Sequence, residues 1–99
     1  MTTDPSFHMT VKDVFSIAKR GTVVTGTVDS GTLKLGDEVI IRGRGQEKKV
    51  TVAGIEMFRK VLGQAVSGDN VGLLLKDVAR QDVQPGDEIV APGADFTWQ

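Results

Sequence analysis

The sequence predicts an all-β protein, and three observations support that prediction. Short runs rich in valine, isoleucine and threonine recur along the chain, twelve glycines separate them, and no segment has the apolar spacing of a helix of useful length. Six short strands without helices favour a closed antiparallel barrel, because closure removes the free edges that invite aggregation. An open β-sandwich is the alternative.

The predicted strands are separated by turns that contain glycine, the residue that tolerates positive φ. They cover residues 8–18, 22–29, 37–42, 48–58, 70–76 and 87–91. The phrases GDEV at 36–39 and GDEI at 86–89 echo each other, and we interpret both as turns that enter a strand.

Length and composition exclude several classes of protein. Ninety-nine residues predict one domain, here a barrel over 1–93 with a tail over 94–99. The absence of cysteine excludes disulfides and Cys-type zinc sites, and His8 is the single histidine, which lies in a start that we expect to be frayed. A formal charge of -1 argues against a broad basic face for nucleic acid. Without a signal peptide or a long apolar run, we expect a soluble, cytoplasmic chain that does not enter a membrane.

The first predicted strand has residues on unexpected faces. Its odd positions form an apolar face made of Met9, Val11, Phe15 and Ile17. Asp13 interrupts this face, while Val14 points the other way. A β-bulge near Lys12 and Asp13 is the structural explanation.

Two further strands leave an aliphatic residue outside the predicted core. In strand 22–29 the even positions point inward and Val23 lies outside. In strand 70–76 the odd positions share one face and Leu74 lies on the other. A single exposed aliphatic residue needs no explanation, but two on neighbouring strands predict the floor of a shallow apolar pocket.

Strand 48–58 changes phase in its middle. Val50 and Val52 lie on even positions, whereas Ile55 and Met57 lie on odd ones, with Gly54 between them. This pattern predicts a bulge or bend. The phrase GIEMFRK that follows at 54–60 brings an acid, an aromatic ring and two bases together, either as a solvated cluster or as a contact for a single-stranded RNA end.

The sequence carries no motif for catalysis. RGTVVTGTV at 20–28 has two glycines at the spacing of a phosphate loop, but Thr27 and Val28 stand where the lysine and the hydroxyl are needed. The adjacent carboxylates at 37–38 and at 87–88 point to opposite faces of a strand, so they cannot serve one substrate. We therefore expect a protein that is not an enzyme.

Six segments, in order, resemble domain 2 of elongation factor Tu. They are DVFSI at 13–17, RGTVVTGTV at 20–28, LKLGDEVII at 33–41, GIEMFRK at 54–60, SGDNVGLLLK at 67–76 and APG at 91–93. The resemblance covers nearly the whole chain, as a fragment or a free-standing homologue. It implies a six-stranded antiparallel Greek-key β-barrel, which in that family lies between a GTPase domain and a second barrel.

The resemblance also implies a function and its residues. Domain 2 of that family helps to bind the aminoacylated 3′ end of tRNA. The positions implied for the 3′ end are Ile17, Val23, Glu56, Arg59 and Leu74, with Glu56 against the adenine. The positions implied for the aminoacyl group are Asp13, Phe15, Thr25 and Asn70, the last through its backbone. GTP and magnesium belong to a domain absent from this sequence, so no cofactor or metal is expected.

Two departures from the family pattern keep an alternative open. Lys12 stands where the family has glutamate, and Lys19 replaces a glycine. The tail over 94–99, with Phe96 and Trp98, does not resemble the family pattern. The alternative is a free-standing barrel that has lost tRNA binding and contacts a protein or the ribosome. Domain 2 of another translational GTPase is a further possibility, against which GIEMFRK argues.

Overall fold

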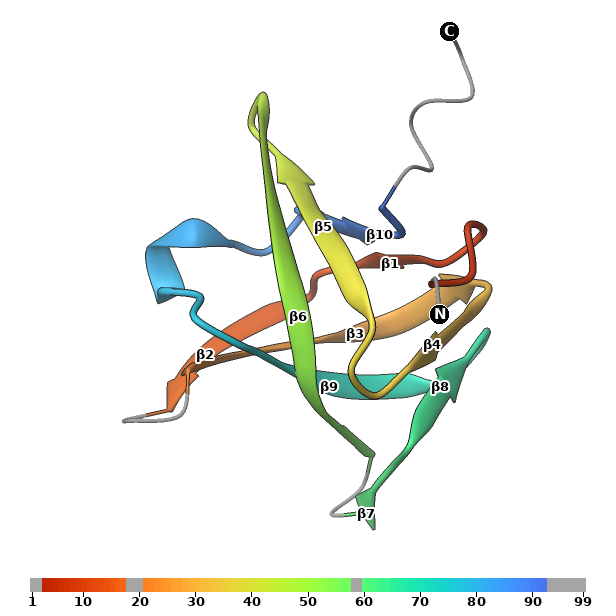
Figure 1. The fold of residues 1–99 in the computed structure, drawn as a ribbon. Coiled ribbons are helices and arrows are strands. Elements are labelled where there is room, and N and C mark those ends of the chain that lie inside the picture. Colours follow the sequence, from red (N-terminus) through yellow and green to blue (C-terminus); the bar gives the residue numbers. More distant parts are fainter. Residues whose placement is uncertain (1–2, 18–20, 58–59, 93–99) are drawn as a thin grey trace, which may run out of the picture.

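The computed structural model describes residues 3–17, 21–57 and 60–92, so the predicted tail and Lys19 lie outside it. The described residues form ten strands and one 3-10 turn (Figure 1). The elements are β1 (His8–Thr10), β2 (Asp13–Ile17), β3 (Gly21–Ser30), β4 (Thr32–Lys34), β5 (Glu38–Gly43), β6 (Gln46–Met57), β7 (Lys60–Val61), β8 (Gln64–Val66), β9 (Asn70–Leu75), η1 (Arg80–Asp82) and β10 (Glu88–Val90). No helix among them is long and apolar enough to cross a membrane.

The strands close into a six-stranded antiparallel barrel. The pairing runs β1-β10-β5-β6-β9-β3, and β3 pairs back with β1. His8 closes the ring, because its Cα partners are Val90 on one side and Ser30 on the other. The closed barrel is confirmed and the open sandwich is wrong. The expectation of a frayed start at His8 is also wrong, since this residue lies in a strand with neighbours on both sides.

The connectivity is a Greek key. β5, β6 and β9 are successive barrel strands that lie side by side, and β10 returns to pair with β5. The chain enters the barrel at β1 and leaves it at β10, so the two ends of the barrel sequence meet at one seam (Figure 1).

The predicted first strand is divided at Val11 and Lys12. The Val11 amide donates to the Asp87 carbonyl at 2.8 Å, whereas the next amide, that of Lys12, donates to the Thr25 carbonyl at 2.7 Å. Successive amides thus bond to opposite neighbours, and the chain leaves β10 to continue beside β3 as β2. The irregularity predicted near Lys12 and Asp13 is a break between β1 and β2, and the register shift in the pairing of β1 with β3 lies between His8 and Met9.

This division turns β2 over relative to β1. Val14 is buried, whereas Phe15 and Ile17 are exposed by 54% and 39%. The prediction that Phe15 and Ile17 share one face with Met9 is therefore wrong, because the irregularity shifts the alternation by one residue. Phe15 and Ile17 lie on the outer face, together with Asp13.

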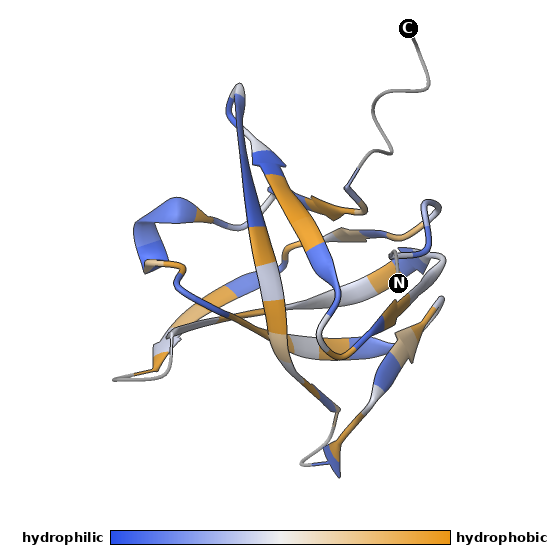
Figure 2. Ribbon diagram, in the orientation of Figure 1, coloured by the Kyte–Doolittle hydropathy of each residue, from blue (hydrophilic) through white to orange (hydrophobic). Residues whose placement is uncertain are grey.

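The core is built from strictly alternating residues of the longer strands. Figure 2 shows hydrophobic residues recurring along β5 and β6, with more polar ones between them. Val24 and Val28 of β3 and Leu73 and Leu75 of β9 are fully or almost fully buried. The phase change in β6 is confirmed as a register shift between Val52 and Gly54, which keeps residues on both sides of the shift in the core.

Gly26 marks the closest approach of two chain segments. A Cβ atom at this position would overlap the Thr10 carbonyl oxygen and lie 3.0 Å from the Met9 Cε. Glycine is needed here because the backbone of β3 packs directly against the end of β1.

One type of turn recurs at three strand ends. The tetrapeptides are Lys34–Asp37, Val66–Asp69 and Gln84–Asp87. In each, the aspartate amide donates to the first residue's carbonyl at 3.0 Å, and the aspartate carboxylate accepts from the first residue's amide at 2.9 to 3.0 Å. The glycine before the aspartate has positive φ, between 91° and 95°. The echo of GDEV and GDEI is thus shared turn chemistry, as predicted, and SGD at 67–69 is a third case.

Three short features were missed by the sequence analysis. β4 and β8 form a separate two-stranded sheet, β7 pairs with the end of β6, and η1 precedes β10. Each strand has only two or three residues, which is too short for an alternating pattern to be recognised.

Candidate functional site

The outer face of four neighbouring strands carries the candidate site. β2, β3, β9 and β6 lie side by side, and residues that pair across antiparallel strands point to the same face. One row across this face consists of Phe15, Val23, Leu74 and Gly54. The next row consists of Asp13, Thr25, Gly72 and Glu56.

On the same face, one further pair of residues lies next to each row, on its outer side. Beyond the first row, Ile17 lies opposite Gly21. Beyond the second row, Thr27 lies opposite Asn70, and the Thr27 hydroxyl donates to the Asn70 side-chain oxygen. All the described residues that the resemblance assigns to the 3′ end and to the aminoacyl group therefore lie on one continuous face.

A small hollow of about 160 Å³ opens on this face. Its lining residues are Ile17, Val23, Ala53, Gly54, Ile55, Glu56, Val61, Gly72 and Leu74. The structure thus brings together Ile17, Val23, Glu56 and Leu74, four of the five residues implied for the 3′ end. The fifth, Arg59, lies outside the described residues.

Two glycines create the hollow. Gly72 and Gly54 stand on the outer face where other residues would project a side chain. A Cβ atom on Gly72 would lie 3.4 Å from Val23 Cγ1 and 3.8 Å from Thr25 Cγ2, so it would occupy the space between them without a clash. On Gly54 it would lie 3.3 Å from the Leu74 Cβ.

The lining is aliphatic except for one charged group. Val23 and Leu74 oppose each other across the β3–β9 pair, and Glu56 is exposed at the edge of the hollow. A carboxylate only accepts hydrogen bonds, so the hollow favours a flat apolar group that carries N–H donors on one edge. Pockets for drug-sized molecules typically have about 300–1,000 Å³, which means that this hollow has room for a single ring system.

The remaining predicted residues lie beside the hollow and do not line it. Asp13, Phe15 and Thr25 are on the adjoining parts of the two rows, and Asn70 lies one pair further along β9. The sequence analysis missed five lining residues, namely Ala53, Gly54, Ile55, Val61 and Gly72. Gly72 could have been found, since it shares the outward phase of Leu74; Val61 could not, because it lies on the unpredicted β7.

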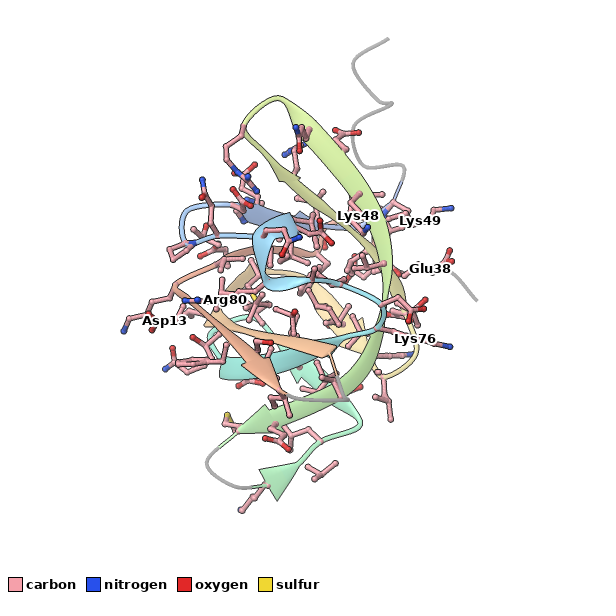
Figure 3. All side chains as sticks on the ribbon, turned by 90° about the vertical axis from the view of Figure 1, so that its left-hand side faces the viewer. Asp13, Glu38, Lys48, Lys49, Lys76 and Arg80 are labelled. Atoms are coloured by element: carbon pink, nitrogen blue, oxygen red, sulfur yellow. The ribbon has the colours of Figure 1, made fainter. Side chains whose placement is uncertain are left out.

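The hairpin of β5 and β6 carries basic residues away from this site. Figure 3 shows Lys49 and Glu38 on the opposite side of the barrel from Asp13, with Lys48 between them. The basic side chains are matched by carboxylates: Arg42 with Glu88, Arg44 with Asp87, Lys48 with Asp82 and Lys49 with Glu38. The positive charges of these four side chains are therefore compensated by carboxylates of the barrel itself.

Two other observations bear on chemistry elsewhere in the described part of the chain. A wider hollow of about 420 Å³ lies between β2 and η1. None of the predicted site residues lines it; its lining residues are Val14, Arg80, Gln81, Val83, Gln84 and Pro85. Within residues 3–17, 21–57 and 60–92, no group of three or more histidine, aspartate or glutamate side chains is placed to hold a metal ion.

The closed ring places this protein in the class of six-stranded antiparallel Greek-key β-barrels. The family model of elongation factor Tu domain 2 matches residues 21–90, which is more than half of the chain. The chain therefore belongs to the elongation factor Tu domain 2 family.

Proposed function

We propose that the hollow on the outer face receives the terminal base of an aminoacylated tRNA 3′ end, and that the barrel acts by binding without catalysis. The observation that carries this proposal is the convergence of Ile17, Val23, Glu56 and Leu74 on one hollow. They come from four different strands. The family membership supports a role in translation.

The chemistry of the hollow fits adenine. The aliphatic side chains of Val23 and Leu74 offer a surface on which a planar base can pack. Adenine presents an exocyclic N–H donor, and the Glu56 carboxylate is an acceptor. Uracil has no exocyclic amine, so it would leave the carboxylate without this bond.

An aminoacyl group attached to that end would lie along the second row. Asp13 and Thr25 face each other there, with Phe15 exposed beside them. Asp13 is close to Lys12, the residue that departs from the family pattern, which makes this part of the surface the place where amino acid preference would differ from the family.

A titration tests the proposal. The chain is mixed with a charged acceptor-stem mimic, the same mimic uncharged, and a charged mimic ending in uridine, at low and moderate salt. We expect weak, salt-sensitive binding that prefers the charged, adenine-ending mimic, because other domains are absent from this sequence. Glu56→Ala, which removes the acceptor, should weaken it about tenfold, the value of one hydrogen bond to a base edge. Glu47→Ala, the same change on β6 outside the hollow, should have no effect.

Two outcomes would contradict the proposal. One is equal affinity for the three mimics with a folded barrel. The other is a Glu56→Ala variant that binds as the unaltered protein does.

A second candidate function is protein or ribosome contact by a barrel that no longer binds tRNA. The exposed aliphatic side chains of Leu35, Val61 and Val66, at 49%, 78% and 39%, favour it. Sedimentation with purified ribosomes tests this candidate. Under this candidate, Leu35→Ser and Val66→Ser would reduce ribosome binding, and the unaltered chain would not bind the charged mimic.

A further inference from the structure

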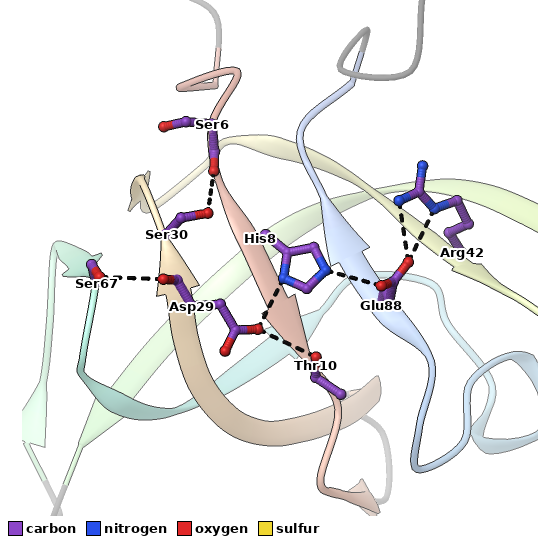
Figure 4. A network of polar contacts seen from close by, with 8 residues as sticks. All are labelled: Ser6, His8, Thr10, Asp29, Ser30, Arg42, Ser67 and Glu88. Atoms are coloured by element: carbon purple, nitrogen blue, oxygen red, sulfur yellow. Dashed lines mark hydrogen bonds and ion pairs between the residues drawn. The ribbon is translucent and has the colours of Figure 1, made fainter. Parts of the chain in front are cut away.

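The seam of the barrel is held by a histidine between two carboxylates. His8 lies on β1, the strand that closes the ring against β10 and β3. Its Nδ1 is 2.9 Å from Asp29 Oδ2 on β3, and its Nε2 is 3.0 Å from Glu88 Oε2 on β10. Figure 4 shows the ring bridging the two strands.

This geometry requires a charged imidazole. A neutral imidazole has one N–H donor and one acceptor nitrogen, whereas the imidazolium has two donors. A carboxylate oxygen only accepts, so a neutral His8 would direct a lone pair at one of the two carboxylates. Both contacts are hydrogen bonds only when His8 is protonated.

The surroundings of His8 keep both carboxylates in place. Asp29 also accepts from the Thr10 hydroxyl at 3.2 Å. Glu88 accepts from Arg42 on β5 at 3.1 and 3.3 Å. The hydrogen bonds from His8 and then from Arg42 lower the pKa of Glu88, so folding favours the ionised form of this side chain.

We propose that His8 is a pH-sensitive clasp for the barrel seam: when protonated it joins β1 to β3 and β10, and when neutral it releases one of the two strands. The protonated clasp strengthens the barrel through both contacts, and the strengthening is lost where His8 is neutral. β1 is the strand affected, because its two partners are the ones that His8 connects.

His8 is the only histidine of the chain, which makes the test specific. The urea unfolding free energy is measured from pH 5.5 to pH 8.5 for the unaltered chain, His8→Gln and His8→Lys. We expect the unfolding equilibrium constant of the unaltered chain to rise about three- to tenfold over this range, the scale of two exposed ion pairs. His8→Gln removes the titrating group, and His8→Lys remains charged, so both should show no such rise.

Asp29→Asn serves as the partner variant, because Asp29 accepts from His8 while Glu88 is also bound by Arg42. It should reduce the pH-dependent rise by about half, since one of the two contacts is lost. Amide hydrogen exchange at each pH should place the loss in β1 and not in β9. Three results would overturn the proposal. The first is a His8→Gln variant whose unfolding free energy depends on pH as that of the unaltered chain does, and the second is an unaltered chain whose unfolding free energy does not change with pH. The third is a loss of amide protection that is spread evenly over the barrel.

Discussion

Val23 on β3 and Leu74 on β9 lie directly opposite each other on the outer face of the barrel and form two walls of the same hollow. Their inward neighbours Val24 and Leu73 are also paired, in the core. The same two strands thus hold the barrel together with one face and shape the candidate site with the other.

Gly72→Ala should close the hollow and leave the barrel intact. The added methyl group would lie 3.4 Å from Val23 Cγ1, in ordinary contact, and Gly72 does not have positive φ. We expect loss of binding to the charged acceptor mimic and an unfolding free energy unchanged or raised by about 0.5 kcal/mol. Gly63→Ala, in open space away from the hollow, is the control. Unchanged binding by Gly72→Ala would show that the hollow is not the site.

Gly26→Ala should damage the fold itself. Its methyl group would overlap the Thr10 carbonyl oxygen, and backbone cannot move aside as a flexible side chain can. We expect a loss of about 3 kcal/mol in the unfolding free energy, the upper range for overpacking, measured by urea denaturation. A loss as small as that of Gly63→Ala would mean that β1 and β3 can separate at this point without cost.

Asp87→Ala should destabilise the barrel more than Asp69→Ala. Both carboxylates accept from the first amide of the same type of turn, but Asp87 is 3% exposed and is also bound by Arg44 at 2.8 and 3.3 Å. We expect a loss of about 2 kcal/mol for Asp87→Ala, against about 1 kcal/mol for Asp69→Ala. Urea denaturation of the two variants in parallel measures the difference, and equal losses would contradict it.

Acid should weaken the barrel through Glu88. Its pKa is lowered from the ordinary 4.5 by hydrogen bonds from His8 and Arg42, so folding favours the ionised form. The resulting stability is present above the ordinary value and is lost as the pH falls below it. The unfolding free energy of Glu88→Gln should therefore fall less between pH 5 and pH 3 than that of the unaltered chain. Glu47→Gln should follow the unaltered chain, and a Glu88→Gln curve of the same shape would contradict the assignment.

Much of the barrel could be predicted from the sequence because its longer strands alternate clearly. The inward residues of β3 and β9 follow period two without interruption, and Gly54 marks the phase change in β6. The same alternation identified Val23 and Leu74 as outward residues, while the resemblance supplied Ile17 and Glu56.

The rest depended on contacts between distant parts of the chain. The alternation predicted an irregularity near Lys12, but the change of partner there follows from bonds of Val11 and Lys12 to Asp87 and Thr25, which no local pattern contains. The clasp likewise joins His8 to residues on two other strands. Gly26 is an intermediate case. Its inward position was predicted, but the requirement for glycine is apparent only from the structure, in which the Thr10 carbonyl oxygen occupies the space of a Cβ atom.

The pairing of β1 with β10 also determines when the barrel can form. His8 is bonded across the seam to the region of Val90, so the first strand lacks one of its partners until nearly all of the barrel sequence has been synthesised. Closing so long a loop is entropically costly and slows folding relative to local pairing. β5, β6 and β9, which are successive strands of the barrel, can pair earlier. Until β10 is synthesised, β1 would pair with β3 alone and would have one unpaired edge.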